Sequence, residues 1–315
     1  MIVRSSVVSA LRLPRSRATR DALWGLGLSL PFLVAVLVLV GIPVVWSAYL
    51  SFTSFDGFNP PTWTGLHNWL RIFHDPATLS AFRNVAFLAL IFVPLQTGLG
   101  LVIALLLHRG LRAVAFLRAI YFLPAISPWM AVGIMWVALF NPEYGVVNAL
   151  LSAIHMPAGL WLLSPNWWVF QLVVALATTW KGVGYAVVLF MAGLQAIPQE
   201  LLDAAKADGA SEWRSLWRIT IPLLSPSTFL VLVLSTIAAS QIFDPILALS
   251  GGGVATNIGG LPNQQVVPTV LLYSQGFGLG HFGYANTIAW ALFIVVAAFV
   301  ILQRRLESRW VHYER

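Results

Sequence analysis

The chain has 315 residues, of which 59% are hydrophobic and only 9% are charged, and its mean hydropathy is +0.83. Because soluble domains average roughly 45–50% apolar and about 25% charged residues, this composition predicts an integral membrane protein. The net charge of +7 does not indicate nucleic-acid binding, since the basic residues are dispersed between apolar segments. The chain contains no cysteine, which excludes disulfides, thiolate metal sites and cysteine nucleophiles.

The chain begins with a basic segment followed by an apolar run. Residues 1–20 contain five arginines and no acidic residue, and the apolar run covers residues 23–48. The apolar core of a signal peptide is usually only about 7–15 residues long, so we expect a retained first transmembrane span. Residues 1–22 are then a basic tail.

Five later runs are also apolar over the roughly 20 residues that a transmembrane helix requires. They cover residues 85–107, 120–140, 167–194, 223–247 and 284–302. Six spans place both termini on one side of the membrane, and fifteen of the eighteen Lys and Arg residues then lie on that side. By the positive-inside rule this side is cytoplasmic. The prediction is an all-α polytopic membrane domain over residues 23–306, with a cytoplasmic C-terminal tail over 307–315.

Residues 197–222 form the longest charge-bearing segment between two apolar spans, and their order predicts two short helices joined by a sharp corner. Pro198 suits the start of the first helix, and Gly209 suits the left-handed backbone that ends it. Ser211 can cap the second helix, with Glu212 in its first turn. We call residues 197–222 the elbow, and we expect it on the cytoplasmic side.

The first helix of the elbow carries Ala204 and Ala205, whose small side chains let another protein's surface approach the backbone closely. The pattern D-A-A-x3-G-x9-I-x-I-P, which starts at Asp203 and ends at Pro222, resembles the cytoplasmic EAA loop of binding-protein-dependent ABC importer permeases. Asp203 stands where that family usually has Glu, and Ile221 where it usually has Leu. In the family this loop is the coupling helix, seated in a groove of the ATPase subunit. The resemblance assigns ATPase coupling to Glu200, Asp203, Ala204, Ala205, Asp208, Gly209, Ile219 and Pro222.

The resemblance implies a type I ABC importer permease in a bacterial or archaeal plasma membrane. Its implied partners are a second, homologous permease subunit, two ATPase subunits, an extracytoplasmic solute-binding protein and membrane lipid. The chain has no nucleotide-binding motif of its own. We therefore expect a transport subunit that is not an enzyme and binds no metal or cofactor, with ATP and Mg held by the ATPase partner.

Three further segments resemble the sugar-type permeases of the same family. The sequence TWTGLHNWLRIF over 62–73 is similar to the extracytoplasmic GLxNY segment, and a folded cap is expected over 51–84. The sequence GLGHFGYANTIAW over 278–290 is similar to the family's entry into the last span. The sequence FDPILALSGGGVAT over 243–256 resembles a signature of sugar and glycerol-phosphate permeases, with departures at Leu247, Ser250 and Gly253. These likenesses imply a solute of the oligosaccharide or glycerol-3-phosphate class.

Lys181 lies near the middle of the fourth predicted span, where a charge is costly and usually faces a partner or a watery path. Three interpretations are open: the amine contacts sugar hydroxyls, pairs with Asp244, or binds backbone carbonyls. Aromatic faces and planar polar groups suit sugar recognition. The candidates for the solute pathway by depth and chemistry are Trp136, Trp180, Lys181, Tyr185, Gln241, Asp244 and Asn286. Each is also explained by packing between membrane helices, as are Gln96 and Thr178.

Two other functions are compatible with a polytopic membrane protein. An ion-coupled secondary carrier would use Lys181 and Asp244, but it leaves the motif of the elbow unexplained. An intramembrane enzyme needs a nucleophile with a base, or a metal-ligand pair such as H-E-x-x-H. The six histidines form no such motif.

Overall fold

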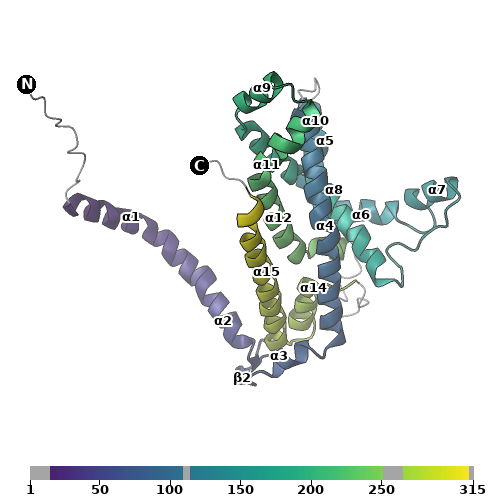
Figure 1. Ribbon diagram of the computed structural model, residues 1–315. Coiled ribbons are helices and arrows are strands. Elements are labelled where there is room, and N and C mark those ends of the chain that lie inside the picture. The colour runs from purple at the N-terminus through teal and green to yellow at the C-terminus, as the bar shows by residue number, and fades with distance from the viewer. Residues whose placement is uncertain (1–14, 109–113, 251–264, 312–315) are drawn as a thin grey trace, which may run out of the picture. The chain divides into compact units, whose positions relative to one another are not determined.

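The computed structural model describes residues 15–108, 114–250 and 265–311 (Figure 1). The chain divides into two compact units, Met1–Leu50 and Ser51–Arg315. In the first unit, α1 (Arg15–Val36) and α2 (Ile42–Leu50) are joined by a π-helical turn over Leu37–Gly41. Because α1 begins at Arg15, the expected boundary of the basic tail at residue 22 falls inside this helix. The rest of that tail lies outside the described residues.

The second unit begins with a short β-hairpin. β1 (Thr53–Ser54) pairs antiparallel with β2 (Thr62–Trp63), so that Thr53 lies opposite Trp63. With α3 (His67–Ile72) the hairpin provides folded structure where a cap over 51–84 is expected. The helices that follow are α4 (Pro76–His108), α5 (Val114–Ile126), α6 (Trp129–Leu139), α7 (Val146–Ala153), α8 (Trp167–Ala196), α9 (Gln199–Ala207), α10 (Glu212–Ser215), α11 (Ile221–Leu223), α12 (Ser225–Ser240), α13 (Asp244–Leu249), α14 (Pro268–Tyr273) and α15 (Phe282–Trp310).

Within the described ranges, four helices are long and apolar enough to cross a membrane. They are Trp24–Leu50, Pro76–His108, Trp167–Ala196 and Phe282–Glu307. These four confirm the predicted runs 23–48, 85–107, 167–194 and 284–302 as apolar helices. The last of them belongs to α15, which extends to Trp310, so the expected boundary of the C-terminal tail after residue 306 falls inside a helix.

The third predicted span, over 120–140, is wrong as a continuous helix. α5 and α6 meet at an angle of 108°, with Pro128 at the break in an extended conformation (ψ 140°). Proline has no N–H to continue a helical hydrogen-bond ladder. Both sides of this break are equally apolar, so apolar composition predicts a span there but not its change of direction.

The fifth predicted span, over 223–247, also differs from the structure. α12 bends by 60° from the helices of the elbow and starts with Pro226 in its first turn. It ends at Ser240, and α13 is a separate short helix that starts at Asp244. The part of the signature-like segment 243–256 that follows Ser250 lies outside the described residues.

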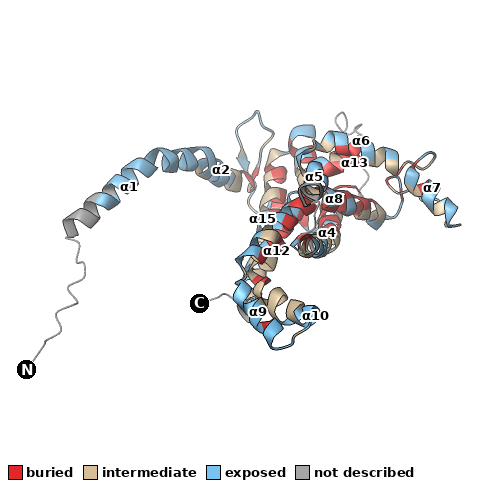
Figure 2. Ribbon diagram, turned by 90° about the horizontal axis from the view of Figure 1, so that it is seen from above, coloured by how far each residue is buried: buried red, intermediate tan, exposed pale blue. Residues whose placement is uncertain are grey.

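α4 and α8 form the most extensive helix contact of the second unit. Gly100 of α4 meets Ala186 of α8 so closely that a Cβ on Gly100 would lie 2.6 Å from the Ala186 Cβ. Phe170 and Phe190 of α8 are completely buried. Figure 2 shows the buried residues gathered along α4, α8 and their neighbours in this unit. α8 is therefore its central element.

A polar seam joins α4 to the start of α15, at the end of the second unit opposite the elbow (Figure 1). The carboxylate of Asp75 accepts hydrogen bonds from the hydroxyls of Thr78 (2.7 Å) and Tyr284 (2.8 Å) and from the backbone N–H of Ala77 (3.2 Å). Arg71 of α3 lies over the Tyr284 ring, 4.0 Å from its centroid. Burial alone would raise the pKa of Asp75, but the hydrogen bonds from Thr78 and Tyr284 outweigh it and lower that pKa. Asp75 therefore caps α4 as a charged carboxylate at neutral pH.

The close contact at Gly100 predicts a selective loss of stability. Replacing Gly100 with Ala puts a methyl group against Ala186, and such overpacking typically costs about 1–3 kcal/mol. A Cβ on Gly98, in the same helix, would meet no atom within 4 Å. We expect Gly100→Ala to lower the thermal unfolding midpoint of the detergent-solubilised protein by a few degrees relative to the control Gly98→Ala. Equal midpoints would show that α4 and α8 do not pack this closely.

Candidate functional sites

The corner of the elbow is a complete helix-ending motif. Gly209 has φ +75°, the left-handed conformation that its position predicts. Its N–H donates to the carbonyl of Lys206 (3.0 Å), and the N–H of Ala210 donates to the carbonyl of Ala205 (2.9 Å). These two bonds are those of a Schellman motif, in which a left-handed residue closes the last turn of a helix. The predicted corner is confirmed.

The second helix of the elbow is capped as expected. The Ser211 hydroxyl accepts a hydrogen bond from the backbone N–H of Arg214 (3.3 Å). α10 continues through a π-helical turn over Leu216–Thr220 into α11. At its far end the Ser225 hydroxyl donates to the carbonyl of Pro222 (2.6 Å). Both arms of the elbow are therefore regular and capped, so the segment can act as one stiff piece.

Five of the eight predicted coupling residues are exposed, three of them on α9 and two at the corner that follows it. Glu200, Asp203, Ala204 and Asp208 are exposed, as is Gly209 at the corner, whereas Ile219 and Pro222 of the second arm are half-buried. Ala205 is only 7% exposed, so of the two alanines only Ala204 presents its side chain at the surface. The Ala205 side chain points toward the rest of the protein, because consecutive residues of a helix point in different directions.

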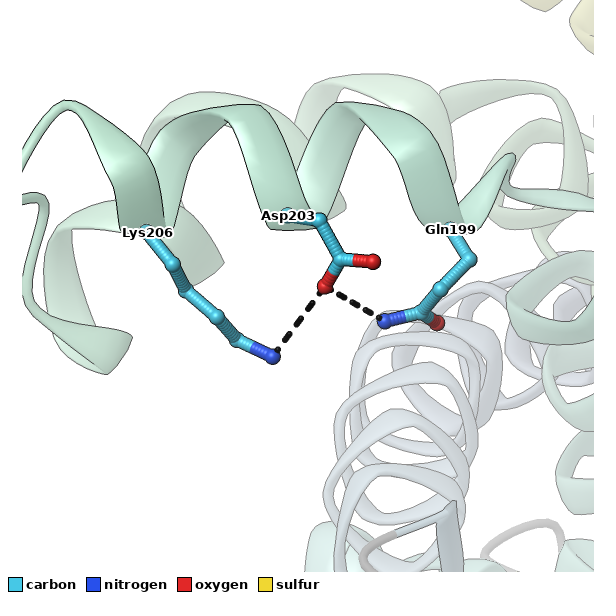
Figure 3. A network of polar contacts seen from close by, with 3 residues as sticks. All are labelled: Gln199, Asp203 and Lys206. Atoms are coloured by element: carbon cyan, nitrogen blue, oxygen red, sulfur yellow. Dashed lines mark hydrogen bonds and ion pairs between the residues drawn. The ribbon is translucent and has the colours of Figure 1, made fainter.

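Asp203 is held by its own helix. Its Oδ1 accepts from Gln199 Nε2 (3.3 Å) and lies 3.5 Å from Lys206 Nζ (Figure 3). Both members of this ion pair are exposed, and such surface pairs contribute little to stability. The pair instead fixes the direction of the carboxylate on the outer face of α9.

Two tryptophans of the elbow were not singled out from the sequence. Trp213 and Trp217 are 68% and 54% exposed, and their rings contact edge to face at 5.6 Å. Their spacing of four residues places them on one face of a helix. That spacing is the signal by which they could have been found.

Lys181 binds the broken third span. Its Nζ donates to the carbonyls of Pro124 (3.1 Å), Ala125 (2.8 Å) and Ser127 (2.7 Å). A lysine ammonium has three N–H donors, so all of them are used. These carbonyls lie at the end of α5, where a helix leaves carbonyls without intrahelical partners. Of the three open interpretations of Lys181, the structure supports backbone binding.

The hypothesised pair between Lys181 and Asp244 is wrong. Asp244 is exposed at the first residue of α13, and in the described part of the chain no hydrogen bond or ion pair joins it to Lys181. The two residues lie on separate elements, and the amine has no donor left for a carboxylate. The charge-paired site of an ion-coupled carrier is therefore not formed.

A cavity of about 740 Å³ lies beside Lys181, between α4, α8 and α12. Its polar lining consists of Gln96, Thr178, Lys181, Tyr185 and Ser235. Gln96 Nε2 donates to the carbonyl of Gly182 (2.8 Å), while its buried Oε1 has no hydrogen-bond partner among the described residues. Tyr185 packs edge-on against Phe122 at 6.0 Å. The cavity thus offers polar side chains, including hydroxyls, and aromatic surface.

The structure divides the seven predicted pathway residues. Lys181 and Tyr185 line the cavity. Trp136 and Trp180 lie against each other at 6.2 Å, with Trp136 stacked on Phe140, and they are not part of its lining. Gln241, Asp244 and Asn286 also lie elsewhere, and the Asn286 amide donates to the carbonyl of Phe282 in its own helix (2.8 Å). Gln96 and Thr178 also line the cavity, and their side chains bind the carbonyls of Gly182 and Val174, as the packing interpretation expects.

Comparison with known proteins matches residues 96–312 to the family described as "Binding-protein-dependent transport system inner membrane component". The chain is 34% identical over 304 residues to the probable ABC transporter permease protein YesP of Bacillus subtilis, with 95% of this chain and 96% of that protein covered. It is 35% identical over 285 residues to the trehalose/maltose transport system permease protein MalF of Thermococcus litoralis, with 90% and 93% covered.

The fold is also similar to a chain in the crystal structure of a bacterial alginate ABC transporter in complex with an alginate pentasaccharide-bound periplasmic protein. The TM-score is 0.77 at 20% identity, with 93% of this chain and 96% of that chain covered. The fold and the comparisons define a permease, the membrane-embedded subunit of a transport complex. This chain belongs to the family of inner membrane components of binding-protein-dependent transport systems.

The contacts of Lys181 predict its role in stability. Lys181→Met keeps the length of the side chain but removes one donor from each of three carbonyls, of which, among the described residues, only that of Pro124 also accepts from a backbone N–H, that of Ser127 (3.2 Å). A buried polar group left unpaired costs about 1–3 kcal/mol. We expect the thermal midpoint of the purified protein to fall by about 2 °C or more. The control Asp244→Asn should leave it unchanged. If reversing both charges in one protein restored the stability lost in Lys181→Asp, the two side chains would have to interact after all.

Proposed function

We propose that this chain is one of two permease subunits in an ATP-driven importer, and that a separate ATPase drives it through the elbow. The observation that carries the proposal is the elbow itself. A Schellman corner at Gly209 and a serine cap at Ser211 hold two short arms rigid, and the outer face of α9 is exposed. A stiff, exposed projection of this kind is suited to docking into another protein. On this proposal its contact residues are Glu200, Asp203, Ala204 and Asp208, with Gly209, Ile219 and Pro222 fixing their position.

The proposed complex has a second permease, two ATPase subunits and an extracytoplasmic solute-binding protein. ATP and Mg are held by the ATPases. The alginate transporter with the similar fold is in complex with a periplasmic protein, which supports the last of these partners. Counting each bent helix pair as one span, as its length and composition permit, gives six spans in a bacterial or archaeal plasma membrane. Both termini and the elbow are then cytoplasmic.

The solute is proposed to be a sugar or a sugar-like molecule of the oligosaccharide or glycerol-3-phosphate class. One relative is named for trehalose and maltose transport, and the similar structure contains an alginate pentasaccharide. The cavity beside Lys181 fits this chemistry, because Trp129 and Tyr185 offer aromatic faces while Gln96, Thr178 and Ser235 offer polar groups. Its volume of about 740 Å³ lies within the range of small-molecule sites, about 300–1,000 Å³.

The elbow can transmit force because it continues directly from α8. This helix ends at Ala196, and α9 begins at Gln199 after Pro198. ATP-driven closure of the ATPases would move the docked elbow, and α8 would move with it. Only a difference in binding between two states of the ATPase can drive such a change, so both the stiffness of the elbow and its docking are required.

The backbone conformation at Gly209 predicts that a substitution there can disrupt coupling to the ATPase without preventing insertion and folding. A Cβ at this position would meet no atom within 4 Å, but φ +75° is strained for a β-branched residue and tolerated by asparagine. We expect Gly209→Val to stay in the membrane but to lose co-purification of the ATPase, or to uncouple ATP hydrolysis from uptake by at least roughly tenfold. Gly209→Asn should retain most of the uptake in proteoliposomes. Normal uptake by Gly209→Val would contradict the assigned corner.

A further inference from the structure

The loop that closes the β-hairpin is held in one conformation. The Oδ1 of Asp56 accepts from the backbone N–H groups of Phe58 (3.0 Å) and Asn59 (2.8 Å), and its Oδ2 accepts from Asn59 Nδ2 (2.6 Å). Gly57, between them, has φ +90°. The hydrogen bonds from Asn59 and Phe58 lower the pKa of Asp56 to about 2. The carboxylate therefore remains ionised and keeps its acceptors at any ordinary pH. We call residues 56–59 the hairpin tip.

The hairpin tip presents a single large apolar side chain. Phe58 is 94% exposed, which makes it the most exposed large hydrophobic residue in the described part of the chain. An aromatic ring is usually buried in a core or in an interface. An aromatic side chain on a rigid backbone loses little conformational entropy when it binds, which is a property of interface anchors.

The base of the hairpin is joined to the first turn of α15. The N–H of Gly283 donates to the carbonyl of Phe55 (3.2 Å), and the Thr287 hydroxyl donates to the carbonyl of Ser51 (2.9 Å). A Cβ on Gly283 would overlap the carbonyl oxygen of Thr53, so the strand and the helix are in direct backbone contact. A displacement of the tip would therefore reach α15 without passing through a flexible linker.

The other side of the hairpin is also fixed. Asn68 is buried, and its side-chain amide donates to the carbonyls of Thr53 (2.9 Å) and Ser51 (3.3 Å). The Phe52 ring stacks on Trp63 at 5.7 Å. These contacts explain the GLxNY-like segment: its asparagine ties α3 to β1. The tip itself packs on α15 at Gly57, where a Cβ would lie 2.7 Å from the Phe282 ring, while the Phe58 side chain remains exposed.

We infer that the hairpin tip is a docking point for the solute-binding protein, with Phe58 as the anchor that enters a pocket on that protein. The inference rests on the proposed function. The tip lies at the end of the second unit opposite the elbow, where a protein delivering solute would arrive (Figure 1). An ionised carboxylate beside Phe58 opposes insertion of the tip into lipid, since burying a charge in hydrocarbon is costly. The Phe58 ring and the Asp56 carboxylate suit a binding protein that has a small apolar pocket surrounded by hydrogen-bond donors.

The test uses the complete transporter with both permeases and the ATPases in nanodiscs, and the sugar-loaded solute-binding protein encoded with it. We expect Phe58→Ala to raise the Kd for the binding protein by roughly tenfold or more, as removal of an interface anchor does. Asp56→Ala, which frees the loop, should raise the Kd by about threefold to tenfold. ATPase activity without the binding protein should not change. The matched control Phe73→Ala removes another exposed ring (69% exposed) and should alter the Kd less than about twofold.

A photocrosslinker of similar shape, p-benzoylphenylalanine at position 58, identifies what the tip touches. Crosslinking to the binding protein only when that protein is added supports the inference. Crosslinking to lipid or to the second permease regardless of the binding protein overturns it, as does an unchanged Kd for Phe58→Ala. If the unsubstituted transporter shows no stimulation of its ATPase by the binding protein, the proposed function itself fails. Normal stimulation combined with an unchanged Kd for Phe58→Ala refutes only the docking point.

Discussion

The ammonium group of Lys181, bound to three backbone carbonyls, stabilises the break between α5 and α6. Inside a membrane there is no water to bind backbone groups, so a helix can break only where other parts of the protein satisfy them. The end of α5 meets this condition because Lys181 supplies three donors from α8. The 108° turn into α6 follows, and the cavity beside Lys181 forms where α5 turns away. One lysine therefore stabilises the bend and supplies polar lining for the cavity.

α8 connects the parts of the second unit that the proposed transport cycle uses. It packs closely on α4 at Gly100, holds the break through Lys181, and leads into the elbow after Ala196. The opposite end of the unit is organised by the start of α15, which receives both the Asp75 carboxylate and the β-hairpin. The elbow and the hairpin thus each adjoin a long helix through short, hydrogen-bonded connections. Movements at either end would be carried by helices rather than absorbed by loops.

The sequence predicted what depends on local chemistry. The corner of the elbow follows from Gly209 and Ser211, whose backbone and capping preferences act within a few residues. Pro128 is expected to kink or start a helix, and α6 does start directly after it, but apolar composition is the same on both sides and so did not predict a turn of 108°. It also left the partner of Lys181 open, and of the seven candidate pathway residues only Lys181 and Tyr185 line the cavity. Which way Trp136 or Asn286 points depends on the neighbouring helices, and those contacts join residues far apart in the chain.

We propose that the elbow faces the cytoplasm, where an ATPase covers α9. The chain has no cysteine, so Ala204→Cys introduces a single reactive thiol into this subunit on the exposed face of α9. The direct measurement is its labelling by a membrane-impermeant maleimide in right-side-out vesicles. Our account predicts no labelling until the vesicles are opened, and protection of the thiol when the ATPase is assembled. Labelling of intact vesicles from outside would contradict it.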